Sequence, residues 1–258
     1  VLAIGVIPLL VVGMLSYNVA RRVSEEQATN YNQAILAQQT DYLDLILRQI
    51  EALIASVSGV DTIKAALDES YDPDDDFRRL ATQAEIGYIL NRFIDLGGLV
   101  GIDIFGDNGA RYHVGDTLDT EEVNYDVLAS MRLRAHNVGS DIYWAGAEAN
   151  VNLRSSHPMV LMAAKELTIV DPDTLRDRPV GLLLVHFSLD RLYDYYSQID
   201  VGAGCYMVIV DNAGRLLFHP DRQRVGQPVN QALLDLLHGA QGTLTGRVDG
   251  TTMFIAHR

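Results

Sequence analysis

The first fifteen residues hold only apolar side chains, glycine and proline, and this run constrains the fold more than any other feature. As a helix it spans roughly 22 Å, less than the roughly 30 Å hydrocarbon core of a bilayer. Tyr17 follows where an interfacial aromatic residue would lie, and Arg21 and Arg22 come one turn later. We therefore predict a transmembrane helix over residues 1–17, completed by residues that precede Val1. A signal-peptide core or a buried helix is the alternative, although no convincing cleavage site follows.

Helix breakers are scarce after this run. Residues 18–68 contain no proline and one glycine, Gly59, which suits a helix that continues out of the bilayer. Apolar residues at alternating spacings of three and four form one stripe, and a second stripe lies on a neighbouring face. The first comprises Leu43, Ile46, Ile50, Leu53, Val57, Val60 and Leu67, and the second Ala28, Tyr31, Ile35, Tyr42 and Leu45. We predict a stalk helix over residues 18–70 that buries one face on its own domain and dimerises through the other; an ordinary core helix is the alternative.

Two sheet modules are predicted beyond an acidic loop at residues 71–76. Asp107-Asn108-Gly109 separates two strand-like runs, and Asn-Gly in that setting is the strongest local indication of a hairpin. The pattern of the first module, residues 77–190, is helix, hairpin, helix and three strands, which predicts an antiparallel sheet with helices to one side. Its predicted helices span residues 77–96 and 123–136, and its strands 99–105, 111–114, 142–145, 158–169 and 180–189.

The same order begins again after a short helix at residues 190–199. A strand at 205–210, the turn Asp211-Asn212-Ala213-Gly214 and a strand at 215–219 repeat the first hairpin. A helix at 230–238 and a hairpin of residues 242–248 and 251–257 follow. We predict a second module over residues 200–258, and we expect the polypeptide to continue with a last strand and a second membrane span. The fold class is thus α+β, with two antiparallel-sheet modules in tandem.

Composition and motifs exclude several functions. Asp and Glu number 34 against 20 Lys and Arg, a net charge of -14, which disfavours a nucleic-acid partner. The one cysteine, Cys205, permits neither an intrachain disulfide nor a Cys-based metal site. The seven histidines show no metal-ligand spacing, and no catalytic motif is present. We predict no enzyme activity, no metal and no cofactor for this segment.

Polar residues inside apolar strands indicate where a ligand could bind. Lys165 interrupts the run at residues 159–164, and His186 interrupts the run at 182–185. Each needs a partner, solvent or a ligand if it faces inward. Tyr143 and Trp144 could stack on that ligand, and a Lys with a partly protonated His favours an anion or a carboxylate. The alternative is that Lys165 and His186 lie on a solvated face and that Trp144 is a core residue.

Three stretches resemble the double Cache sensor domains of bacterial transmembrane receptors. They are residues 101–109 (GIDIFGDNG), residues 179–192 (PVGLLLVHFSLDRL) and residues 208–220 (VIVDNAGRLLFHP) with Val225-Gly226. The resemblance implies a membrane helix, a stalk helix and two PAS-like modules, of which the membrane-distal one holds the ligand. In amino-acid-binding members an aspartate on the strand after the Pro-Val-Gly turn takes the ligand's amino group, and His186 stands there in this sequence. The carboxylate-gripping arginine and Trp-Tyr pair are also not recognisable, which puts an α-amino-acid ligand in doubt.

The functional hypothesis is an extracytoplasmic sensor that binds a small molecule through Tyr143, Trp144, Lys165 and His186 in the distal module. It predicts an inner-membrane location, with residues from about 18 onward in the periplasm or extracellular space. A homodimer would pass the signal to a cytoplasmic histidine kinase, chemotaxis or cyclic-di-GMP output domain. The alternative is a dimerisation or periplasmic partner-protein-binding module without a ligand, and a periplasmic hydrolase is a third class, which no motif supports.

Overall fold

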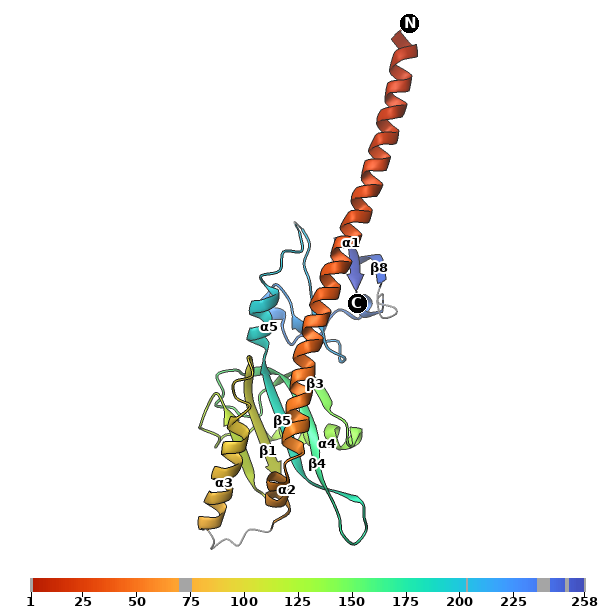
Figure 1. The fold of residues 1–258 in the computed structure, drawn as a ribbon. Helices are drawn as coiled ribbons and strands as arrows, with labels where there is room; N and C mark the ends of the chain where they lie inside the picture. The colour runs from red at the N-terminus through yellow and green to blue at the C-terminus, as the bar shows by residue number, and fades with distance from the viewer. Residues whose placement is uncertain (1, 70–75, 203, 236–241, 249–250, 258) are drawn as a thin grey trace. The chain divides into compact units, whose positions relative to one another are not determined.

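The computed structural model describes residues 2–69, 76–202, 204–235, 242–248 and 251–257; the side chains of residues 2–11 and of some others within helices and strands lie outside the description. The chain divides into two compact units, one of residues 46–229 and one of residues 1–45 with 230–258. Figure 1 shows the elements. The helices are α1 (Leu2–Ser58), α2 (Asp61–Asp68), α3 (Asp76–Asn91), α4 (Tyr125–Val138), α5 (Leu189–Tyr196) and α6 (Gln231–Leu234), with a 3₁₀ turn at Arg222–Arg224. The strands are β1 (Leu99–Gly106), β2 (Arg111–Gly115), β3 (Tyr143–Ala149), β4 (Met159–Val170), β5 (Asp177–Ser188), β6 (Ile209–Val210), β7 (Leu216–Phe218), β8 (Gly242–Val248) and β9 (Thr251–His257).

The larger unit is built on a five-stranded antiparallel sheet in the order β2-β1-β5-β4-β3. β5 lies at its centre, and residues 180–188 of this strand are all buried. The β1–β2 hairpin that the Asn-Gly turn predicts is confirmed, and Gly109 takes the positive φ of 85° that the turn requires. The predicted α+β class with a long N-terminal helix and an antiparallel sheet is therefore confirmed.

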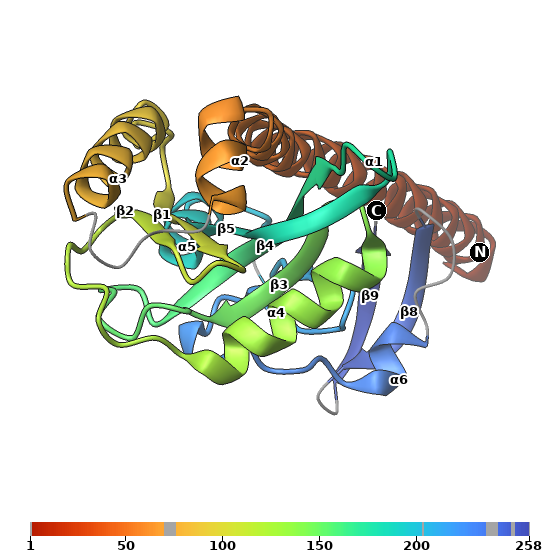
Figure 2. The same cartoon turned by 90° about the horizontal axis from the view of Figure 1, so that it is seen from below.

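Helices cover both faces of this sheet. Figure 2 shows α2 and α3 on one side of it and α4 on the other. The face toward α4 contributes to a continuous apolar core that includes Phe105, Met162 and Leu184, with Met131 and Ala135 from α4. On the opposite face, α2 contacts β4 and β5 and buries Ile63, Ala66 and Leu67. The α4 face is the one that carries the candidate site.

The predicted stalk helix is interrupted once, at Gly59. α1 ends at Ser58, Val60 is extended at φ −79° and ψ 116°, and α2 starts at Asp61. Glycine costs roughly 1 kcal/mol in a helix interior relative to alanine, and the break lies at the one glycine of residues 18–68. The first apolar stripe is largely intramolecular, because Ile46, Ile50, Leu53 and Val57 are buried.

A salt-bridge network joins the sheet to the β6–β7 hairpin within the larger unit. Arg215 donates from Nε to Asp211 Oδ2 at 3.0 Å and from Nη1 to Glu148 Oε1 on β3 at 2.7 Å, and its Nη2 donates to the carbonyl of Ala145. Burial by itself lowers the pKa of Arg215, but the hydrogen bond and charge of Glu148 and those of Asp211 raise it above the ordinary value. The cation is therefore permanent, and the turn at 211–214 is fixed to the edge strand β3.

The predicted second module over residues 200–258 has a different form in the described residues. β6 and β7 make one two-stranded sheet in the larger unit, and β8 and β9 make another in the smaller unit. The hairpin predicted at 242–248 and 251–257 is confirmed, whereas the strand predicted at 205–210 shortens to Ile209–Val210. A complete second PAS-like sheet is not seen among these residues.

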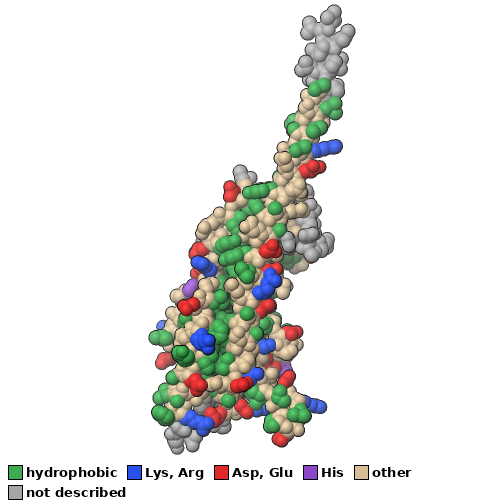
Figure 3. Space-filling view, in the orientation of Figure 1, with side chains coloured by type: hydrophobic (Ala, Val, Ile, Leu, Met, Phe, Trp, Pro, Cys, Tyr) green, Lys and Arg blue, Asp and Glu red, His purple; other side chains and the backbone are tan. Residues whose placement is uncertain are grey.

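The smaller unit contains most of α1. From Val12 to Ser24 the described side chains of this helix are exposed, and several are apolar, including Val12, Leu15 and Tyr17. Figure 3 shows hydrophobic side chains on the surface of this part of the helix. Among the residues that the structure describes, no helix meets the length and apolarity needed to cross a bilayer. Much of the predicted span, residues 1–17, lies where side chains are outside the description.

Candidate functional site

The site is centred on His186 in the middle strand of the sheet. The register places His186 between Gly101 of β1 and Met162 of β4. Its side chain is 1% exposed, and neither ring nitrogen has a hydrogen-bond partner. A buried polar group without a partner costs roughly 1–3 kcal/mol, so this position calls for a functional explanation.

Asp103 of β1 lies beside it and is the anion of the cluster. Its Oδ2 is 3.4 Å from His186 Nε2, while its Oδ1 accepts from His113 Nδ1 at 2.9 Å and from Arg111 Nη2 at 3.3 Å. Burial alone would raise the pKa of Asp103, but the hydrogen bond from His113 and the positive charges around the carboxyl lower it below its ordinary value. Asp103 is therefore ionised inside the protein and paired with groups from β2.

His113 is held between two acceptors. Its Nδ1 faces Asp103 Oδ1, and its Nε2 lies 3.1 Å from the carbonyl oxygen of Thr117. Both ring nitrogens thus face acceptors, and each contact is a hydrogen bond only when that nitrogen carries a proton. Room for the ring comes from Gly101 and Gly115, which pair across β1 and β2: a Cβ on either would stand 3.3 or 3.1 Å from His113 Cε1.

Two polypeptide segments adjoin the cluster. The segment after β2 contacts it directly, because Arg111 Nη1 donates to the carbonyl of Thr120 and the amide of Asp116 donates to Val100 O at 2.9 Å. Asp116 in turn binds residues 155–157, accepting from Ser156 N at 2.8 Å and from Ser156 Oγ at 2.7 Å. Burial raises the pKa of Asp116, but these serine hydrogen bonds outweigh it and lower the pKa overall. Residues 116–124 and 150–157 are thus joined to each other beside the cluster.

The register divides the four predicted site residues between the two faces. His186 pairs with Met162, and Tyr143 pairs with Ala164, so both lie on the α4 face. Lys165 pairs with Leu183, three residues along β4 from Met162, which places it on the opposite face, and Trp144 lies there through its pairing with Ala163.

The polar contacts of these residues differ as well. Lys165 Nζ donates to the carbonyl of Ser140, and Tyr143 Oη accepts from Arg134 Nη1 at 2.7 Å at the edge of the sheet. The structure therefore does not bring the four together as one site, and His186 alone belongs to the buried cluster.

Sequence reasoning did not select Asp103, Arg111 or His113. The rule that selected His186, a polar residue within an apolar strand, applies equally to Asp103, which stands between Ile102 and Ile104. Arg111 and His113 lie in a short strand of mixed character, where alternation with Tyr112 and Val114 gives no sign of which face is buried. Their role follows only from the β1–β2 register, which sets His113 opposite Asp103.

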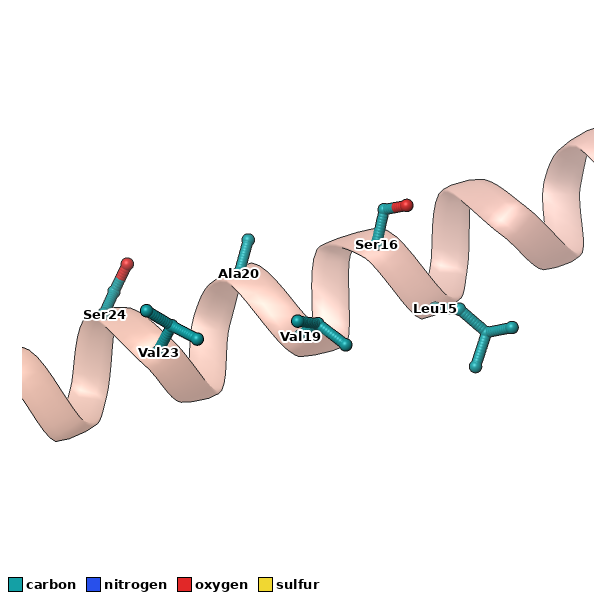
Figure 4. Close-up of a pocket in the computed structure, with 6 residues that line it drawn as sticks. All are labelled: Leu15, Ser16, Val19, Ala20, Val23 and Ser24. Carbon is teal, nitrogen blue, oxygen red and sulfur yellow. The ribbon is translucent and has the colours of Figure 1, made fainter.

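Other places in the described residues offer less. A depression on α1 is lined by Leu15, Ser16, Val19, Ala20, Val23 and Ser24 (Figure 4). All six side chains are exposed, so a small molecule there would remain largely in water. Within the described part of the chain, no cluster of three or more His, Cys, Asp or Glu could hold a metal ion.

The buried histidine predicts an acid-sensitive fold. Burial, opposed in part by Asp103, lowers the pKa of His186 below its ordinary 6.5. At a pH between the lowered pKa and 6.5, the unfolded chain binds a proton that the folded chain does not bind. The free energy of unfolding therefore falls as pH drops below about 6.5. The pKa of Asp103 is lowered from 3.8, so the free energy of unfolding falls further as pH drops below about 3.8.

The measurement is the melting temperature from pH 8 to pH 5. His186→Gln should flatten the decline in this interval, and the exposed His136→Gln should leave it in place. If the melting temperature of His186→Gln declines as much as that of the wild-type protein, His186 is not the source of the decline.

No family model matches the sequence, and a search of curated proteins finds no relative. Solved structures do resemble it. The ligand-binding domain of the Pseudomonas fluorescens chemoreceptor CtaA, in complex with L-serine, is 15% identical, with a TM-score of 0.58 over 89% of each chain. The ligand-binding domain of Mlp24 with asparagine is 13% identical, with a TM-score of 0.59 over 89% of this chain and 87% of the other. That of the Pseudomonas aeruginosa PAO1 amino-acid chemoreceptor PctC, in complex with GABA, is 15% identical, with a TM-score of 0.55 over 88% and 90%.

These similarities show that the chain has the fold of chemoreceptor ligand-binding domains. The resemblance to receptor sensor domains inferred from the sequence is confirmed at the level of the fold.

Proposed function

We propose that this segment senses a small molecule and that the ligand binds on the α4 face of the sheet, at the cluster around His186. The observation that carries the proposal is a histidine that is 1% exposed with both ring nitrogens unpartnered, next to the ionised Asp103. Serine, asparagine and GABA, which occupy the similar domains, all carry a carboxylate. Arg111 and His113 make the same chemistry reasonable here, and we propose a carboxylate-bearing ligand.

The test is a thermal-shift screen of the protein against carboxylates, amines, purines and polyamines. A ligand at 100 times its dissociation constant adds about 2.7 kcal/mol to the free energy of unfolding. For a protein of this size, that raises the melting temperature by roughly 5–10 °C. If carboxylates give no shift, the proposed ligand class is wrong, and a chain that responds to no small molecule fits the alternative of a partner-protein-binding module.

Two alanine variants locate the site for any carboxylate that binds. His186→Ala should weaken binding about tenfold or more, because a hydrogen bond to a charged group contributes roughly 1.5–3 kcal/mol. Lys165→Ala should leave the affinity unchanged, since Lys165 lies on the other face and binds the Ser140 carbonyl. Isothermal titration calorimetry measures the affinity of both variants for the carboxylate. A large loss of affinity in Lys165→Ala alone would show that the ligand binds on the opposite face.

The receptor context is also part of the proposal. In it, residues 1–17 anchor the chain in the inner membrane, residues 18–70 form a stalk, and residues 77–190 and 200–258 form distal and proximal modules outside the cytoplasm. Ligand binding would bias two arrangements of the distal module, and a homodimer would transmit the change to a cytoplasmic output domain. A ligand can shift this equilibrium only by its difference in affinity for the two states.

The second apolar stripe of α1 is the proposed dimer surface. Tyr31 and Leu45 on this stripe are 58% and 51% exposed. We expect Tyr31→Glu with Leu45→Glu to convert a dimer to a monomer, because like charges would face each other across the helices. Sedimentation equilibrium measures the change, with Tyr88→Glu on the exposed side of α3 as the control. A dimer that survives the double substitution would place the interface elsewhere.

A further inference from the structure

The buried ring of His186 can form at least one more hydrogen bond. The ionisable groups that face it are Asp103 from β1, Arg111 and His113 from β2, and Asp116 from the segment after β2. On its other side β4 places Met162 next to it, in the apolar core that α4 completes. Asp103 is the nearest of these charges, and it reaches one edge of the ring.

The position of Asp103 assigns the tautomer of the neutral ring. Nε2 lies 3.4 Å from Asp103 Oδ2 without forming a hydrogen bond, and the negative charge of the carboxylate favours the ring proton on this nitrogen. Nδ1 is then a buried acceptor without a hydrogen-bond partner. When Nδ1 is protonated, it becomes a donor that needs a second acceptor.

His113 shows what a second acceptor does in the same cluster. Its two ring nitrogens face the Asp103 carboxylate and the Thr117 carbonyl, so each ring nitrogen has an acceptor. His186 has the carboxylate but lacks the second acceptor. From this difference, and resting on the proposed function, we infer that a carboxylate ligand binds at Nδ1 of His186 together with one proton from solvent, which forms the Nδ1–H bond that the ligand accepts.

Charge balance supports the inference. Asp103 and Asp116 already place negative charge near His186, so a carboxylate that binds without a proton would add an unpaired negative charge in a buried place, at a large cost. With a proton on His186, the added charges cancel, and the imidazolium lies between two carboxylates. Without ligand, burial lowers the pKa of His186, so the proton is absent until the ligand arrives. An ammonium group at Nδ1 would instead compete with that proton, and its binding would weaken as pH falls.

The test uses the full chain with pyruvate, L-lactate, succinate and L-malate as probes, and L-serine and GABA for comparison. The tightest carboxylate is titrated calorimetrically at pH 7.5 in phosphate and in Tris, whose ionisation enthalpies differ. We expect the apparent binding enthalpies in the two buffers to differ by about the difference between the two buffer ionisation enthalpies, as uptake of one proton requires. We also expect the dissociation constant to rise up to tenfold between pH 7 and pH 8.

His186→Gln keeps an N–H and an acceptor but takes no proton, so it should abolish both the buffer dependence and the pH dependence. His136→Gln, at an exposed histidine paired with Glu166, should retain both. A carboxylate that binds wild-type protein with no proton uptake would overturn the inference while leaving the proposed function intact, and this result needs no variant. If none of these six carboxylate-bearing compounds binds, the proposed ligand class fails and the inference fails with it.

Discussion

Asp103→Asn should destabilise the protein by about 3–5 kcal/mol, the cost of removing one partner from a buried ion pair. The substitution keeps the size of the side chain but leaves Arg111 and His113 without the carboxylate that both contact. Asp103 is 1% exposed and His113 8%, so water cannot replace the lost charge. Urea unfolding measures the change.

Asp107→Asn is the matched control for this substitution. Asp107 follows the same strand and pairs with Arg132, but both side chains are more than 40% exposed. Exposed ion pairs contribute roughly 0–1 kcal/mol, so Asp107→Asn should lower the free energy of unfolding by an amount in that range. Equal effects of the two substitutions would show that the buried cluster does not hold the ionised carboxylate that the account requires.

Gly146→Ala should cost about 2–5 kcal/mol. Gly146 has a φ of 77°, where a side chain costs roughly 1–2 kcal/mol. It adjoins a bulge in β3, where the register with β4 shifts between Trp144 and Gly146. An added Cβ would stand 2.0 Å from Asp211 Oδ2, so the turn at 211–214 must move away from β3. Overpacking of this kind costs roughly 1–3 kcal/mol more.

Gly109→Ala separates the two contributions. Gly109 also has a positive φ, 85°, but nothing lies within 4 Å of its added Cβ. It should therefore show the backbone strain alone, about 1–2 kcal/mol. If urea unfolding gives the two variants the same loss, then the contact between β3 and the Asp211–Arg215 turn contributes nothing to stability.

The local parts of the fold could be predicted from the sequence. Asn108-Gly109 predicts the β1–β2 hairpin because the turn needs residues that accept a positive φ, and the strands follow from their apolar runs. The Gly59 break was not predicted, since one glycine within a long helical pattern is tolerated as often as it interrupts. The single sheet expected for residues 200–258 depends on pairing between distant segments, which local patterns do not specify.

The site was predictable only in part, for the same reason. A polar residue in an apolar strand singled out both His186 and Lys165, but this pattern does not show that the two lie on opposite faces, because facing depends on the β4–β5 register. That register is set across the connection at residues 171–176 and by the whole length of both strands. The cluster itself joins Asp103, His113 and His186 from three strands, and their proximity follows only from the order β2-β1-β5.

We propose that a carboxylate ligand binds beside His186. The carbon–proton ring spectrum of the protein's seven histidines, recorded during titration with the tightest carboxylate of the panel, tests this proposal. The His186 resonance is assigned by its loss in His186→Gln. We expect this resonance to move most, toward the position of a protonated ring, with a smaller change at His113 and none at His136. A carboxylate that binds while the His186 resonance stays in place would contradict the proposal.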